Sequence, residues 1–456
     1  MLSVNLKSTL SLCDAARTLL QWLGQTNIDF TQNFSVGLDV AHACEQEFFC
    51  MGGIGRIYFK SRDSELEWWG LGACESIFQS HVDDESALSQ VVKKKSHLND
   101  DLIYFGGIRF DKNRSISSEW HDFRCEFFVL PMLLMKHSAE GFRLSLNYRL
   151  GGLPSKVWLD HAQTILMAIM NNKVVLESID YSFNDYVYPS FDSYKTIIEQ
   201  ALSLLMSNEH YKKVVIGRCT RRTFSKSFDP LHIFLRLKEV PHAFLFMFDN
   251  GFGSTFLGAT PELLYRRIGQ NFETESLAGT RPRSKYEQED ELLRKELFAS
   301  HKDKSEHFFV SKHIEDRMRE FGISDLFTSK LEILSLPFVQ HLRRRYHGRI
   351  DEKLSDDKII EALHPTPAVC GLNAHEAKLF IRDNEGFDRG FFASPIGYIA
   401  KNSAEFAVAI RSALYKDAQL YIYAASGIVP GSQAEQEWEE IENKQKNILC
   451  VFEELA

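Results

Sequence analysis

Several short segments in the second half of the chain hold residues that can exchange protons or bind a cation. Lys213 opens the strand-like segment KVVIGR, and Glu262 ends the segment GATPE. Further acids, small-residue turns and basic residues follow between residues 277 and 444. Such a set suits acid–base chemistry on a small polyanion that a metal ion helps to hold.

The segment KVVIGR alternates as a β-strand does, which predicts that Lys213, Val215 and Gly217 share one face of a sheet. Gly217 is the smallest residue of the strand, so we expect room for a ligand beside the lysine. A lysine acts as a base only where burial or a nearby cation favours its neutral form. The other interpretation, which the spacing alone favours, is a strand-end lysine that reaches water.

A second candidate, Glu262, follows the predicted turn residues Gly258 and Pro261. A carboxyl group at such a position can act as a general acid if its pKa is raised. An ordinary exposed glutamate is the alternative. In LAGTRPR, Gly279 and Thr280 predict a tight turn whose backbone N–H groups could bind a carboxylate.

Three glutamates could bind a divalent cation. Glu306 lies in a charged segment that we expect to be helical, and Glu437, Glu440 and Lys444 fall on one stripe of a last helix. Magnesium takes oxygen ligands and few protein carboxylates. The alternative is a solvated helix face with a Glu440–Lys444 surface pair worth a few tenths of a kcal/mol. Local spacing does not separate these interpretations.

The bulk composition narrows the class of protein. The chain has 456 residues, of which 44% are hydrophobic and 25% charged, as expected for a large globular protein. Its net charge of −9 argues against a nucleic-acid partner, yet allows a local basic pocket for a small anion. The eight cysteines form no CxxC pair, which favours reduced thiols in a cytoplasmic protein over a zinc site. We expect neither a signal peptide nor a membrane span.

We expect two parts: a sheet-rich N-terminal part, residues 1–192, and a catalytic part, residues 193–456. Apolar spacing predicts a helix over 8–24 that ends at Gly24, and the charged segment 286–320 is expected to be mostly helical. Strands and helices mix without a regular βαβα repeat. This pattern predicts an α+β fold with large antiparallel sheets flanked by helices.

The ordered series of motifs resembles the chorismate-utilising enzymes, which include isochorismate and salicylate synthases and the synthase subunits for anthranilate and aminodeoxychorismate. The resemblance covers about residues 193–450 and also includes VQHL, HPTPAVCG, AIR, ASGIVPGS and EWEEIENK. It implies the aminodeoxychorismate synthase-like fold. Within the family, the chain is most similar to the menaquinone-type isochorismate synthases, because of KVVIGR, the form of the last helix, and Ala368 where ammonia-using relatives tend to have threonine.

The resemblance implies a role for each candidate. Lys213 would be the base that deprotonates water, and Glu262 the acid that protonates the departing C4 hydroxyl. Glu306 and Glu440 would bind Mg²⁺, with Glu437 acting nearby. The implied substrate-binding residues are Gly279, Thr280, His341, Ala368, Arg411, Gly427 and Lys444.

The implied reaction adds water at C2 of chorismate and removes the C4 hydroxyl, giving isochorismate, for menaquinone biosynthesis. One departure affects the pocket, since residues 392–395 read FASP where relatives often read YAGP. Alternatives are a salicylate synthase, an aminating subunit of an anthranilate or aminodeoxychorismate synthase, and a non-catalytic chorismate-binding regulator. We expect no amidotransferase subunit, because Ala368 argues against amination, and either a monomer or a homodimer.

Overall fold

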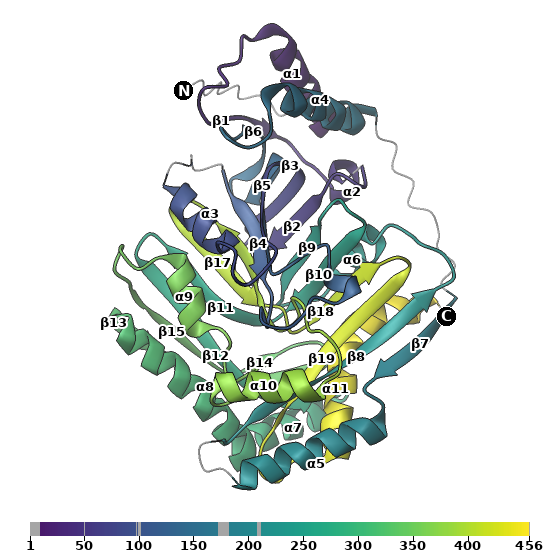
Figure 1. The fold of residues 1–456 in the computed structure, drawn as a ribbon, viewed down its shortest axis with the longest axis vertical. Coiled ribbons are helices and arrows are strands. Elements are labelled where there is room, and N and C mark those ends of the chain that lie inside the picture. The colour runs from purple at the N-terminus through teal and green to yellow at the C-terminus, as the bar shows by residue number, and fades with distance from the viewer. Residues whose placement is uncertain are drawn as a thin grey trace.

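The computed structural model describes residues 10–49, 51–96, 98, 102–171, 182–207 and 211–455. In these residues 19 strands form one sheet in which every ladder between strands is antiparallel. Helices flank this sheet at both ends of the molecule (Figure 1). The α+β prediction with large antiparallel sheets is therefore confirmed.

The strands are β1 (Phe34–Val40), β2 (Arg56–Lys60), β3 (Glu67–Gln79), β4 (Tyr104–Ile108), β5 (Glu126–Ser138), β6 (Gly141–Tyr148), β7 (Phe183–Tyr188), β8 (Val214–Phe224), β9 (Phe244–Asp249), β10 (Ser254–Thr260), β11 (Glu262–Ile268), β12 (Asn271–Pro282), β13 (Ser324–Thr328), β14 (Glu332–Ser335), β15 (Val339–Arg349), β16 (Pro395–Ile399), β17 (Ser403–Val408), β18 (Ser412–Lys416) and β19 (Gln419–Ile428). Strands β9 and β10 are buried along their whole length, and β9 (FLFMFD) is apolar except for its last residue.

The helices are α1 (Leu12–Gln25), α2 (Glu45–Phe48), α3 (Ala87–Lys95), α4 (Ser155–Asn171), α5 (Phe191–Ser207), α6 (Leu231–Leu237), α7 (Glu287–Ala299), α8 (His301–Glu320), α9 (Asp356–Leu363), α10 (Ala374–Asn384) and α11 (Ala434–Leu449), with 3-10 turns at Ser118–Trp120 and Cys450–Leu455. Among the described residues, no helix combines the length and the apolar character that crossing a membrane requires.

Helix α1 confirms the predicted N-terminal helix but not its ends. It begins after Ser11, whose hydroxyl accepts a hydrogen bond from the backbone N–H of Asp14, as an N-cap does. It runs through Gly24 to Gln25 and ends at Thr26, so the predicted stop at Gly24 is wrong by one residue. The charged segment 286–320 forms two helices, α7 and α8, as expected for a mostly helical region.

The sheet is a long ribbon with two arms. One arm runs in the pairing order β7, β8, β19, β18, β10, β9, β2, β3, β5. The other runs β5, β4, β16, β17, β11, β12, β15. Both arms share β5. Helix α11 packs on β19 of the first arm, and α8 packs on β12 and β15 of the second (Figure 1). The ladders β2–β9 and β4–β16 each pair a strand before residue 192 with a strand after it, so the two predicted parts share one sheet. The predicted boundary between residues 192 and 193 stays a prediction.

The chain passes from one arm to the other at Pro261, the single residue between β10 and β11. Strand β10 pairs in the first arm, and β11 pairs in the second. The predicted turn at Gly258 is therefore wrong, because Gly258 lies inside β10, where a Cβ would approach the backbone oxygen of Arg411 to 2.3 Å. Glu262 begins β11 directly after the crossing, which places its side chain between the arms.

Candidate active site

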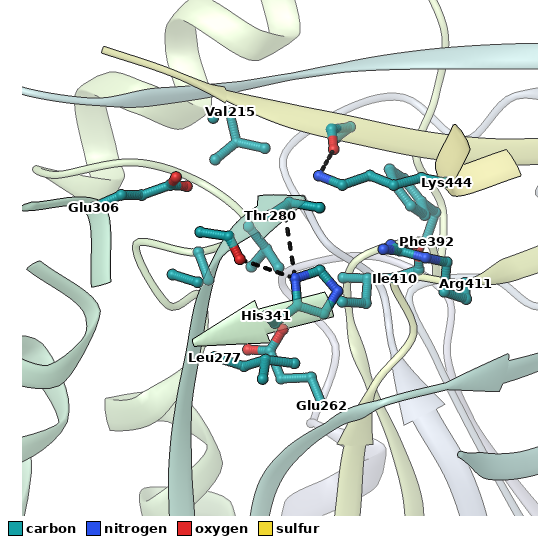
Figure 2. Close-up of a pocket in the computed structure, with 16 residues that line it drawn as sticks. Val215, Glu262, Leu277, Thr280, Glu306, His341, Phe392, Ile410, Arg411 and Lys444 are labelled. Atoms are coloured by element: carbon teal, nitrogen blue, oxygen red, sulfur yellow. Dashed lines mark hydrogen bonds between the residues drawn. The ribbon is translucent and has the colours of Figure 1, made fainter. Parts of the chain in front are cut away.

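A cavity lies between the two arms and brings together most of the residues that the motifs single out. It is lined by Glu262, Gly279, Thr280, Glu306, His341, Ala368, Arg411, Gly427 and Lys444. In Figure 2 the carboxyl group of Glu306 lies on one side of this space, and the amine of Lys444 lies on the other. Glu437 and Glu440 instead line an adjoining cavity, with which the first shares Thr280.

Lys213 stands immediately before β8 and is fully buried. Its ammonium donates a hydrogen bond to Glu306 Oε1 at 2.7 Å. Gly427 on β19 makes room for this pair, since a Cβ there would lie 2.8 Å from Lys213 Cε and 2.6 Å from Glu306 Oε1. The water-exposed interpretation of Lys213 is therefore wrong, and the lysine is held inside the molecule by a carboxylate.

The predicted space beside Gly217 is not available to a ligand. The backbone N–H of Gly217 donates to Glu385 Oε1 at 2.6 Å, and a Cβ on Gly217 would lie 3.0 Å from the same oxygen. Gly217 thus admits a buried Glu385–Arg389 ion pair from the segment after α10. The small residue that leaves room for the Lys213 side chain is Gly427, on the partner strand β19.

The electrostatic setting of Glu306 favours its charged form. Burial alone would raise the pKa of Glu306, but the positive charges of Lys213, Lys444 and Lys302 outweigh it and hold the pKa below its ordinary value. Glu306 is therefore an anion at neutral pH. Helix α8 carries it into the site, because Gly279 has a positive φ of 78° and lets α8 approach closely at Asp303.

Glu262 has the opposite setting. Its side chain is buried, and burial together with the negative charge of Glu275 raises its pKa to about 8, although Lys213 and Arg411 oppose this shift. The exposed-glutamate interpretation is therefore wrong. At neutral pH this carboxyl group keeps its proton and can donate it, as a general acid must.

Arg411 presents unused hydrogen-bond donors to the cavity. Nη1 donates to the backbone oxygen of Ile410 at 3.1 Å, whereas Nε and Nη2 are buried and meet no acceptor within the described part of the chain. Burial lowers its pKa to about 10, so the group still carries a charge at neutral pH. Since buried polar groups in proteins are usually hydrogen-bonded, these donors indicate that an anionic ligand completes the site.

The predicted stripe of Glu437, Glu440 and Lys444 lies on α11, and Glu437 and Lys444 are buried. Lys444 donates to the backbone oxygen of Ala425 at 2.8 Å and pairs with Glu440 at 2.6 Å. The Glu440–Lys444 pair of the surface interpretation does form, but the Lys444 side chain is only 11% exposed, so it is not a solvated surface pair. Its ammonium is part of the cavity wall.

His341 on β15 is neutral. Its Nδ1 lies 3.1 Å from the Gly279 carbonyl oxygen and 3.2 Å from Thr280 Oγ1 (Figure 2). Burial, Arg411 and Lys444 lower its pKa to about 3. Because a carbonyl oxygen only accepts, Nδ1 carries the hydrogen and Nε2 is free to accept one. Gly279 itself lies at an irregularity of β12, between Ala278 and Thr280, so the tight turn predicted there is wrong.

The three candidate metal ligands offer carboxylate oxygens only, which is the donor type that Mg²⁺ prefers. Among the described residues, no group of three metal-ligating side chains lies close enough to form a ready metal site. Burial and the negative charge of Glu440 raise the pKa of Glu437, so these two carboxylates act on each other. Lys444 links them to Glu306, because it pairs with Glu440 and its positive charge also acts on Glu306.

Lys302, which no motif contains, donates to Glu437 at 3.0 Å. Its one signal in the sequence is a position four residues before Glu306 in a charged segment. Phe392 stands at the departure from the family motif. Phe392 lines the cavity, and its ring stacks on Tyr423 with a centroid distance of 5.4 Å. The departure thus leaves an apolar wall at this position.

Comparisons with known proteins agree with this geometry. Residues 34–453 match the family described as chorismate binding enzyme. The chain is 32% identical to the isochorismate synthase MenF of Haemophilus influenzae, covering 88% of this chain and 86% of that protein. It is 31% identical to the chloroplastic isochorismate synthase 2 of Arabidopsis thaliana, covering 79% of this chain and 66% of that protein.

The fold also matches a solved structure, that of MenF, the menaquinone-specific isochorismate synthase from Escherichia coli. The TM-score is 0.81 at 24% identity, over 96% of this chain and 99% of that chain. At this identity the match supports the fold. The family match over residues 34–453 and the 32% identity to the Haemophilus influenzae protein show that the chain belongs to the chorismate-binding enzyme family and is a homologue of the isochorismate synthases.

Proposed function

We propose that the protein is a magnesium-dependent isochorismate synthase, an isomerase that converts chorismate to isochorismate for menaquinone biosynthesis. The observation that carries this proposal is the buried Glu262, which retains its proton at neutral pH in the same cavity as the unpaired donors of Arg411. An acid beside an anion-binding group is what removal of a hydroxyl from a carboxylated ring requires. The isochorismate synthase relatives support the same reaction.

Substrate binding rests on charge complementarity. Chorismate carries two carboxylates, and Arg411 and Lys444 are the cations that line the cavity. The backbone at Gly279, Thr280 and Gly427 would supply further donors close to the ring. Neutral His341 adds no charge and can accept a hydrogen bond from a substrate hydroxyl through Nε2.

The proton transfers balance with the two proposed catalytic groups. Lys213, in its neutral form, accepts a proton from a water molecule as the water oxygen bonds to C2. The ring double bonds shift, the C4–O bond breaks, and Glu262 gives its proton to the departing hydroxyl, which leaves as water. One proton is taken and one is given, so no redox cofactor is needed.

Glu306, Glu440 and Glu437 would hold Mg²⁺, which would offset the charge of the substrate carboxylate and help to fix the ring. Lys213 can accept a proton only after it loses the one that it shares with Glu306 in their 2.7 Å hydrogen bond. Glu306 must therefore turn from Lys213 toward another cation during the catalytic cycle. The proposed base role depends on this change of partner.

Ala368 lines the cavity and bears on the choice between water and ammonia. Its methyl group offers no hydrogen bond, whereas a threonine hydroxyl there could orient ammonia. This favours hydration over the aminating alternatives and agrees with an enzyme that needs no amidotransferase subunit. Salicylate synthase remains the second candidate, because elimination of pyruvate can use the same pocket. The oligomeric state and the cytoplasmic location stay predictions.

Product analysis tests the proposal. The purified protein is incubated with chorismate and Mg²⁺, with and without EDTA, and the products are separated by chromatography. We expect isochorismate only with Mg²⁺, and none from Lys213→Ala. Salicylate with pyruvate as the main products would contradict the proposal, as would an aminated product at alkaline pH in ammonium chloride. Binding of chorismate without turnover would favour the regulator.

A further inference from the structure

Each glutamate of the proposed magnesium site is paired with a lysine. The pairs are Glu306–Lys213 at 2.7 Å, Glu440–Lys444 at 2.6 Å and Glu437–Lys302 at 3.0 Å. The protein thus supplies one ammonium group for each of these carboxylates. Lys213 and Lys444 have roles in the proposed reaction, but Lys302 has none.

Lys302 reaches its partner from the first turn of α8. Ser300 caps this helix by accepting a hydrogen bond from the N–H of Asp303 at 3.2 Å, which fixes the backbone beside Lys302. The Lys302 side chain is 41% exposed, whereas the Glu437 side chain is 3% exposed. A flexible lysine from the protein surface therefore neutralises a carboxylate that is itself buried.

The cavity around this pair has room for a hydrated ion. It has a volume of about 200 Å³ and is lined by Lys302, Glu437, Glu440 and Thr280, among others. Thr280 also lines the cavity of the proposed reaction. Lys302 contacts Glu437 directly, and the negative charges of Glu440 and Glu306 also act on its ammonium group. All three proposed metal ligands therefore attract this lysine electrostatically.

We propose that Lys302 is a built-in competitor of the divalent cation: its ammonium group neutralises the buried Glu437, and it must withdraw before the ion binds to that carboxylate. This inference rests on the proposed function, which assigns Mg²⁺ to these glutamates. Withdrawal needs only side-chain rotation toward solvent. The apparent dissociation constant for Mg²⁺ then equals the intrinsic constant divided by the fraction of molecules in which Lys302 has withdrawn. Lys302 would therefore set how tightly the enzyme holds its metal.

Calorimetric titration of the chorismate-free enzyme with MgCl₂ tests this idea without any measurement of turnover. Lys302→Met keeps an unbranched, flexible side chain of nearly the same length and removes its charge. We expect this variant to bind Mg²⁺ about 3- to 10-fold more tightly than the wild type, as for a withdrawn state populated at roughly 10–30%. Lys302→Arg keeps a cation and should stay close to the wild type.

Lys304→Met is the matched control. Lys304 lies on the same helix, and its ammonium lies over the ring of Phe298 at 5.7 Å instead of on a proposed ligand. It should leave the Mg²⁺ affinity unchanged. An equal gain in Lys304→Met would mean that overall charge, not competition, sets the affinity, and would overturn the inference. Unchanged or weaker Mg²⁺ binding by a folded Lys302→Met or Lys302→Gln protein would overturn it too.

The product assay separates this inference from the proposed function. Isochorismate formation by the wild type, with no affinity difference in Lys302→Met, refutes the competitor and leaves the function standing. The predicted affinity difference without any isochorismate refutes the function and leaves the competitor standing. Failure of every protein to bind Mg²⁺, with or without chorismate, contradicts both the competitor and the metal site.

Discussion

Strand β11 carries two buried carboxyl-containing clusters that have opposite character. At its start, Glu262 faces the cavity with a pKa raised to about 8. Farther along, Tyr265 and Arg267 donate to Asp356, which is fully buried at the start of α9. Burial would raise the pKa of Asp356 as well, but its hydrogen bonds and ion pair with Arg267 outweigh it and lower the pKa.

The difference lies in how completely each cluster satisfies its own charges. Asp356 Oδ1 accepts from Arg267 Nε at 2.8 Å and from Tyr265 at 3.1 Å, while Oδ2 accepts from Arg267 Nη2 at 2.9 Å and from Lys95. In the cavity, by contrast, Arg411 keeps two buried donors without acceptors in the described residues. A complete ionic cluster holds elements together, and an incomplete one indicates where a charged ligand is expected.

The largest expected effect concerns the acid of the incomplete cluster. Glu262→Gln keeps the shape and neutrality of the protonated carboxyl group but has no proton to give. We expect kcat to fall by about 10² to 10⁴, with the melting temperature unchanged or higher, because position 262 no longer holds a buried ionisable group. Steady-state rates with chorismate and thermal unfolding measure the two quantities.

Glu273→Gln serves as the control for Glu262→Gln. Glu273 lies on the neighbouring strand β12, where it pairs with Arg266 at 3.2 Å outside the cavity. Its variant should retain the wild-type rate. A folded Glu262→Gln protein with more than half of the wild-type kcat would show that Glu262 is not the acid.

The next effect falls on stability and concerns the complete cluster. Arg267→Met leaves the buried Asp356 without its bidentate partner, so we expect the free energy of unfolding to fall by about 3–5 kcal/mol. The protein that remains folded should keep its kcat, because no atom of this cluster lines the cavity. Urea denaturation followed by circular dichroism gives the first quantity. A loss below 1 kcal/mol would mean that Asp356 finds other partners or takes up a proton without penalty.

Arg411→Met should reverse that pattern. Removing a charge-assisted contact worth about 1.5–3 kcal/mol would raise KM for chorismate roughly 10- to 150-fold. The free energy of unfolding should change little, because the guanidinium has few partners of its own to lose. Kinetics and urea denaturation of the same preparation make the comparison. Strong destabilisation with an unchanged KM would assign Arg411 to structure instead of substrate.

The sequence predicted what depends on local order. The alternation around Lys213, the stripe of Glu437, Glu440 and Lys444, and the antiparallel α+β class all follow from periods of 2 and 3.6 residues, which a single segment contains. The order of the motifs led to the family, and the family match confirms it.

The features that were wrong or missed depend on contacts between distant segments. The space beside Lys213 comes from Gly427, more than 200 residues later in the chain, and not from Gly217. Likewise, Glu262 was expected to follow a turn, although it follows a crossing between the two arms of the sheet. The residues of one segment do not indicate which distant strand or helix will lie opposite them. The ion pair between Lys302 and Glu437 could not be predicted for this reason.

The smallest expected effect is a pH dependence with opposite signs for the two clusters. Above about pH 8, Glu262 loses the proton that the reaction needs, so kcat/KM should fall about tenfold per pH unit. Between pH 4.5 and 8 the unfolded chain ionises this carboxyl group more readily than the folded protein does, so Glu262 lowers stability as pH rises. Asp356 has a lowered pKa and therefore contributes stability above pH 3.8 that is lost as pH falls through its folded value.

Urea denaturation of the wild type and of Glu262→Gln at pH 5 and pH 8 isolates the contribution of Glu262. The stability advantage of the variant should be larger at pH 8, because only the wild type then has to keep a proton that its unfolded chain has released. An advantage that is equal at both pH values, together with kcat/KM constant up to pH 9.5, would mean that Glu262 is already ionised at neutral pH. The contrast between the two clusters of β11 would then disappear, and another group would have to protonate the departing hydroxyl.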